Sequence, residues 1–150
     1  MTRLEKLQNK IHNDGIIVNE YSFNTNQKAA CMEYDDYKTI AIDRAAIRGS
    51  AEELVVVAEE YAHYATGALY DVCPKSNESH ARFIRMMAEG QAHRHAMHTQ
   101  VPFDEMKEVL TKYMYYDGDI DMDGLAEHFE VTYEFVKQAV DHYYDIGRRW

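Results

Sequence analysis

The chain has 150 residues, of which 46% are hydrophobic and 12% aromatic, so it carries enough apolar side chains to form a packed core. Its formal net charge of -10 argues against direct binding to the phosphate backbone of a nucleic acid. No stretch approaches the roughly 20 apolar residues that span a bilayer, and the first residues lack the apolar segment of a signal peptide. We therefore expect a cytoplasmic protein with neither a nucleic-acid nor a membrane partner.

The N-terminal third is predicted to contain one helix and a small antiparallel sheet. Residues 3–15 have apolar side chains at helical spacing, and Gly15 is suited to a left-handed helix end. The β-branched and aromatic run 16–23 predicts a strand. Two further short runs, 29–34 and 38–43, are joined by an Asp-Asp-Tyr segment and predict a β-hairpin.

The rest of the chain is predicted to be helical. Ser50 and Glu53 fit the S-x-x-E pattern of a capping box, which would begin a helix that ends near Gly67. A polar loop over 71–79 follows. Further helices are expected over residues 80–99, 103–116, 123–129 and 132–144. The fold class is therefore α+β: an N-terminal helix, a small antiparallel sheet, and a helical C-terminal part.

Two cysteines, Cys31 and Cys73, lie far apart and form no C-x-x-C pattern. Isolated thiols in an intracellular chain are usually small buried hydrophobic groups. Neither a disulfide nor a cysteine metal site is expected.

The helix predicted after Ser50 contains Glu59-Glu60-Tyr61-Ala62-His63, which differs at one position from the zinc motif H-E-x-x-H. Residues four apart lie on the same side of a helix, so Glu59 and His63 are expected to project together. A catalytic zinc needs three protein ligands and one open position. The next helix offers Glu89, with His93 one turn later.

The stretch "LVVVAEEYAHYATG" resembles the ImmA/IrrE family of zincin-like metallopeptidases, which are found with mobile elements and prophages. The family helix carries H-E-x-x-H, and variants with E-E-x-x-H followed by tyrosine are similar to this stretch. Similar features follow in Glu89-Gly-Gln-Ala92, Ala96 and Val101-Pro102, in the hairpin "CMEYDDYKTIAID" and in the tail "LAEHFEVTYEFVKQAVDHYY". The order of these features along the chain is similar to that of the family over roughly residues 4 to 146, although the distinctive residues are few.

This resemblance implies a zincin-like metallopeptidase domain over residues 1–102 and a helical extension, 103–150, packed on it. It implies a metal-dependent endopeptidase that cleaves a helix-turn-helix repressor of a phage or mobile element. Glu60 would be the general base of the hydrolysis, and zinc the metal. The implied metal ligands are Glu59, His63 and Glu89.

Glu59 departs from the family pattern, because a carboxylate replaces an imidazole. Two carboxylates and one imidazole make the metal a weaker Lewis acid, and oxygen ligands also suit Mn or Fe. His93 offers a second imidazole if it turns toward the metal. The alternative function is a non-catalytic protein that binds a regulator through a degenerate metallopeptidase site.

The segment Asp119 to Glu130 matches the D-x-D-x-D-G-x5-E pattern of a calcium-binding EF-hand loop. Ala126 stands where such loops carry a bulkier apolar residue, and no second loop accompanies it. We favour a helix over this segment, followed by a second helix capped by Thr132. A calcium-responsive interaction module is the remaining alternative.

Histidines are concentrated in "HRHAMH", which contains His93, His95 and His98. Such a cluster can bind adventitious metal or respond to acid pH. For His95 and His98, however, the pattern favours a half-exposed helix face. No partner is identifiable from sequence for His12, His80, His128 or His142.

Overall fold

The computed structural model describes residues 1–67 and 78–147 and shows an α+β arrangement, as predicted. The predicted loop around Cys73 lies outside these residues, apart from its last two positions, which belong to a helix. Two short 3-10 turns interrupt the chain at Arg44–Ala46 and Thr111–Tyr113. The regular elements are α1 (Arg3–Asn13), β1 (Ile17–Glu20), β2 (Ala29–Tyr34), β3 (Tyr37–Ile42), α2 (Ser50–Thr66), α3 (Glu78–Gln100), α4 (Phe103–Leu110), α5 (Met122–Phe129) and α6 (Tyr133–Gly147).

The sheet is mixed, with strand order β1-β3-β2, so the prediction of a purely antiparallel sheet was wrong. The predicted hairpin is present, because β2 and β3 pair antiparallel along their length. β1, however, pairs with β3 in parallel, with Ile17 opposite Thr39. The segment 21–28 connects β1 to β2, which lie at opposite edges of the sheet. β3 then lies between these two strands. The central position suits β3, because Ile40 and Ile42 are completely buried.

The capping box lies at α1, and the one predicted at α2 is wrong. Thr2 Oγ1 accepts a hydrogen bond from the Glu5 backbone amide, and the Glu5 carboxylate accepts one from the Thr2 amide. At α2, Ser50 is the first helical residue, and no side chain caps the helix. Glu52 instead binds Lys28, so this part of the helix is tied to the loop before β2.

The predicted helix ends are confirmed at Gly15 and Gly67, which have left-handed φ angles of 76° and 67°. α4 is shorter than predicted and ends at Leu110. Beyond it the backbone leaves the helix, and Met114 forms a short antiparallel bridge with Ile120.

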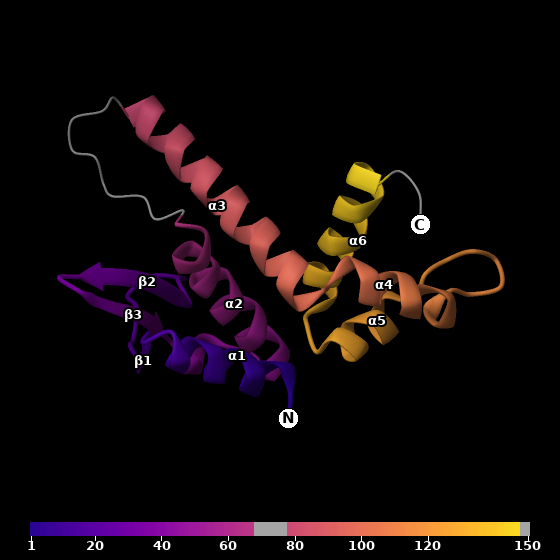
Figure 1. Ribbon diagram of the computed structural model, residues 1–150, viewed down its shortest axis with the longest axis horizontal. Coiled ribbons are helices and arrows are strands. Elements are labelled where there is room, and N and C mark those ends of the chain that lie inside the picture. The colour runs from indigo at the N-terminus through magenta and orange to yellow at the C-terminus, as the bar shows by residue number, and fades with distance from the viewer. Residues whose placement is uncertain (68–77, 148–150) are drawn as a thin grey trace.

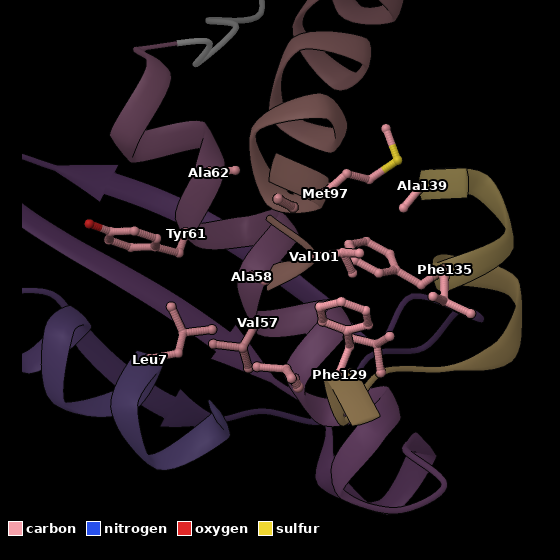
Figure 2. Packing of buried hydrophobic residues seen from close by; sticks show 14 of the residues in the cluster. Leu7, Val57, Ala58, Tyr61, Ala62, Met97, Val101, Phe129, Phe135 and Ala139 are labelled. Carbon is pink, nitrogen blue, oxygen red and sulfur yellow. The ribbon is translucent and has the colours of Figure 1, made fainter. Parts of the chain in front are cut away.

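α2 lies between the sheet and α3, and α4, α5 and α6 gather around the C-terminal end of α3 (Figure 1). Figure 2 shows Phe129 and Phe135, from the C-terminal helices, in the same cluster as Val57 of α2 and Val101 after α3. One hydrophobic core therefore continues from the first helix into the last. Within the described ranges, no helix is both long and apolar enough to cross a membrane.

Candidate functional site

The three predicted metal ligands and His93 lie where α2 packs against α3. Glu59 and His63 lie one turn apart on α2, and Glu89 and His93 lie one turn apart on α3. The two helices run in opposite directions, so the order of their contacts is reversed: His63 pairs with Glu89, and Glu59 pairs with His93. The helix pair thus carries two successive glutamate–histidine pairs across its interface.

In the first pair, an imidazole nitrogen lies close to a carboxylate oxygen. His63 Nε2 and Glu89 Oε2 are 3.4 Å apart. Two ligand atoms at about 2.0–2.2 Å from a tetrahedral zinc are themselves roughly 3.3–3.6 Å apart. The His63 side chain is only 6% exposed, whereas that of Glu89 is 57% exposed, so the pair joins a buried imidazole to a carboxylate at the surface.

In the second pair, Glu59 is bound to His93. The distance from Glu59 Oε1 to His93 Nδ1 is 2.7 Å, a short charge-assisted hydrogen bond. This hydrogen bond raises the pKa of His93, against the opposing effect of burial. The His93 ring also lies edge-on to Phe135, with centroids 5.8 Å apart, so α6 helps to fix its orientation.

Glu60 lies beside Cys31 of β2, and it is also near enough to Glu89 of α3 for that charge to raise its pKa. Its carboxylate accepts hydrogen bonds from the backbone amide and the thiol of Cys31, and it lies near His63. Burial raises the pKa of Glu60, while the charge of His63 and the Cys31 hydrogen bonds partly offset this effect. Burial also raises the pKa of the Cys31 thiol, to about 12, with Glu60 as a further cause. Glu60 is therefore a carboxylate whose proton affinity is increased beside the first glutamate–histidine pair.

Tyr64, the residue after His63, anchors α2 to the sheet. Its hydroxyl donates to the Thr39 carbonyl at 2.8 Å and accepts from the Thr39 amide at 3.1 Å. It also contacts the carbonyl of Met32 on β2. Because the tyrosine contacts both hairpin strands, it holds the neighbouring residues of α2 in a defined position relative to β2.

A hollow of about 310 Å³ opens beside these residues. Glu59, Glu89 and His93 line it, and small residues of α3 form the rest of its wall. Glu59 and Glu89 therefore share access to one solvent-connected space, although their hydrogen-bond partners differ.

The donor set fits a metal in part. His63 and Glu89 fit as two ligands, but the third predicted ligand, Glu59, is directed to His93. Among residues 1–67 and 78–147, no three His, Cys, Asp or Glu side chains are arranged to hold a metal ion. Helical spacing is not the obstacle, because side chains four residues apart on a helix can bind one metal ion; Glu59 is held away from the His63–Glu89 pair by its hydrogen bond to His93.

The calcium-loop alternative does not match the observed local structure. Residues 122–129 form α5, whose N-terminus is capped by Asp121 through a 3.0 Å hydrogen bond from the Gly124 amide. Glu130 accepts a hydrogen bond from the Arg3 amide at 2.8 Å. These carboxylates are bound to backbone amides, and Thr132 caps the next helix by accepting from the Phe135 amide at 3.3 Å, as predicted.

Sequence reasoning did not identify Cys31 as a neighbour of Glu60. The two residues are distant in the chain, and no motif links them, because their contact depends on how the hairpin packs against α2. The pairing of Glu59 with His93 likewise does not follow from the sequence, which offers His93 only as a substitute ligand.

Comparison with known proteins found no matching family model, no matching curated protein and no matching solved structure.

Proposed function

We propose that this protein is a metal-dependent endopeptidase of the ImmA/IrrE type with a zincin-like fold. The observation that carries the proposal is the 3.4 Å approach of His63 Nε2 to Glu89 Oε2 between adjacent helices. The half-buried Glu60 beside this pair adds a candidate proton acceptor. The sequence resemblance, centred on E-E-x-x-H, supports the same assignment.

In this proposal His63 and Glu89 hold the metal, and Glu59 completes the ligand set after leaving His93. Zinc, or Mn or Fe, would polarise the scissile carbonyl and acidify the attacking water. Glu60 takes a proton from the attacking water and returns it to the leaving amine. Its burial favours this exchange, because a carboxyl with increased proton affinity is a stronger base. Tyr64 keeps the helix that carries these groups fixed against the sheet.

The proposed substrate is a helix-turn-helix transcriptional repressor of a phage or mobile element, as the resemblance implies. A protein substrate suits the open position of the site: Glu89 is largely exposed, and the neighbouring hollow is continuous with solvent. The net charge of -10 favours a substrate segment that carries positive charge.

A second candidate function is a non-catalytic regulator-binding protein with a degenerate site. The Glu59–His93 hydrogen bond of 2.7 Å favours it, because this bond occupies the third predicted ligand. In that case the metal is absent, and the two glutamate–histidine pairs serve only to join α2 to α3.

Zinc content separates the two candidates. Protein loaded with zinc and dialysed is expected to retain one ion per chain at this site, and Glu89→Ala is expected to lose it. Glu108→Gln, on the exposed face of α4, is the matched control and should retain the ion. Equal zinc content in Glu89→Ala and wild type would refute the ligand assignment, and no zinc in either would support the second candidate.

Catalysis requires a separate test, with the helix-turn-helix regulator encoded nearest to this chain as the probe. Glu60→Gln is expected to keep the zinc and to lose cleavage by at least about 100-fold, the usual contribution of a general base. Cleavage by Glu60→Gln at the wild-type rate would show that this residue is not the base.

A further inference from the structure

A second histidine pair lies away from the site described above, where α6 packs on α3. His98 of α3 and His142 of α6 approach each other with their Nε2 atoms 3.2 Å apart. Their rings are nearly perpendicular, at 82°, with centroids 5.1 Å apart. The pair joins two segments that are far apart in sequence, and neither residue contributes to the glutamate–histidine pairs of α2 and α3.

The tautomer of His98 follows from its second contact. The Tyr143 hydroxyl donates its proton to the Val101 carbonyl at 2.5 Å, so its oxygen is left to accept. His98 Nδ1 lies 3.4 Å from this oxygen, a contact that favours the tautomer with the proton on Nδ1. In that tautomer the lone pair of His98 Nε2 is directed at His142. A histidine whose other nitrogen donates a hydrogen bond is the usual arrangement of an oriented metal ligand.

The separation of the two nitrogens suits a shared zinc ion. Zinc binds imidazole at about 2.0–2.1 Å, so two nitrogens in a tetrahedral site are roughly 3.3–3.4 Å apart. The observed 3.2 Å requires only a small adjustment of either ring. His98 is exposed and His142 is half-buried, so solvent can supply the two remaining ligands.

The charges around this pair come from both helices. Arg94 and His93, on α3, disfavour positive charge at His142, and Asp145, on α6, favours it. Burial is the largest cause that lowers the pKa of His142.

We propose that His98 and His142 form a zinc site that links the C-terminal helix α6 to α3. The site has two protein ligands, and water completes the coordination. Zinc bound there holds α6 against the helix that carries Glu89 and His93. This proposal is independent of the proposed peptidase activity, because it involves different ligands.

Calorimetric titration of the full chain with zinc chloride at pH 7.5 tests the site. Wild type is expected to bind zinc, and His98→Gln and His142→Gln should each lower the zinc affinity by at least about tenfold. The affinity of the double variant should be no lower than that of the single variant that binds zinc less tightly. His12→Gln, an exposed histidine on α1, is the matched control and should bind as wild type does. Unchanged zinc binding in both pair variants would overturn the proposal.

Glu89→Ala distinguishes this site from the proposed catalytic one. It should leave the His98–His142 event intact, whereas the pair variants should leave the ion at Glu89 intact. Amide hydrogen exchange provides a second readout. Zinc should slow the exchange of α6 amides in the wild type and should not change their exchange rate in His98→Gln. If zinc does not alter exchange in α6 of the wild type, the two histidines are joined only by a hydrogen bond, and the proposed link is wrong.

Discussion

Glu59 and Glu60 are adjacent in the chain, yet their surroundings give them different chemistry. Glu59 is held by His93 across the helix interface, and Glu60 is half-buried against Cys31 of β2. The motif identifies both residues as candidates, because their spacing from His63 follows from the helical repeat. Their partners come from α3 and the hairpin, so their properties depend on packing that the motif does not encode.

Cys31 provides a test of this environment at the level of one residue. Its pKa of about 12 means that almost no thiolate exists at pH 8. In a Cys73→Ser variant, Cys31 should react with iodoacetamide about a thousandfold more slowly in the folded protein than in denaturant, because only the thiolate reacts. The measurement is the alkylation rate by mass spectrometry. Similar rates in the two states would show that Cys31 is not buried against Glu60.

Among the elements, the hairpin was predictable and the strand order was not. Two short runs joined by a short polar segment predict the pairing of β2 with β3 directly, because that pairing is local. The position of β1 depends on which strand is buried deepest. Ile40 is completely buried, whereas Ile17 is 47% exposed. This difference depends on how the helices pack against the sheet.

Helix capping gives a test at the same scale. Thr2→Ala should lower the free energy of unfolding by about 1 kcal/mol, because the mutation removes the side-chain acceptor of the capping box at α1. Ser50→Ala, at the position where sequence alone predicts a box, should change it by less than about 0.5 kcal/mol. Urea denaturation of both variants checks this expectation. Equal losses would mean that Ser50 also caps its helix.

Glu105 of α4 connects elements from both ends of the chain. It binds Arg3 of α1, and it lies 3.1 Å from His128 Nε2 of α5. Burial raises the pKa of Glu105, but Arg3 and His128 together outweigh this effect and lower it. A carboxyl whose folded-state pKa is lowered contributes stability above its unfolded-state pKa, and that contribution is lost as the pH falls through the folded-state value.

Glu105→Gln should therefore destabilise the protein at pH 7 by about 1 kcal/mol or less, as is usual for partly exposed ion pairs. The difference from wild type should shrink once the pH falls below 4.5, the ordinary value for this group. Urea denaturation at pH 7 and at pH 3.5 measures it. A difference that is the same at both pH values would exclude the ion pairs as its cause.

At the scale of the whole molecule, one core joins the predicted metallopeptidase domain to the helical extension. Phe129 of α5 and Phe135 of α6 are almost completely buried in the same cluster as Val57 of α2 (Figure 2). The apolar periodicity of each helix was readable from the sequence. Which faces meet was not, because it depends on contacts between residues that are distant in the chain.

Phe129→Ala should lower the free energy of unfolding by about 3–5 kcal/mol, because it leaves a cavity in this shared core. Calorimetry should show a single transition at a lower temperature, since the core unfolds as one unit. Tyr116→Ala, at a fully exposed aromatic residue, is the control and should leave the transition in place. Two separate transitions in the Phe129 variant would show that the two parts unfold independently.

The candidate site follows the same division between local pattern and global packing. The E-E-x-x-H spacing predicts only that Glu59 and His63 project together, and Glu89 is implied by the resemblance; in the structure His63 lies 3.4 Å from Glu89. Because α2 and α3 pack antiparallel, Glu59 binds His93 and does not join the His63–Glu89 pair. The packing of α6 against α3 brings together His98 and His142. A single helix motif carries no information on these cross-helix partners.

The anomalous-difference map of a zinc-soaked crystal, collected at the zinc absorption edge, tests the proposed peptidase site most directly. The proposal predicts a peak about 2.0–2.2 Å from both His63 Nε2 and a Glu89 oxygen, with Glu59 turned away from His93 to join them. A map with no peak between α2 and α3, and with Glu59 still bound to His93, would contradict it.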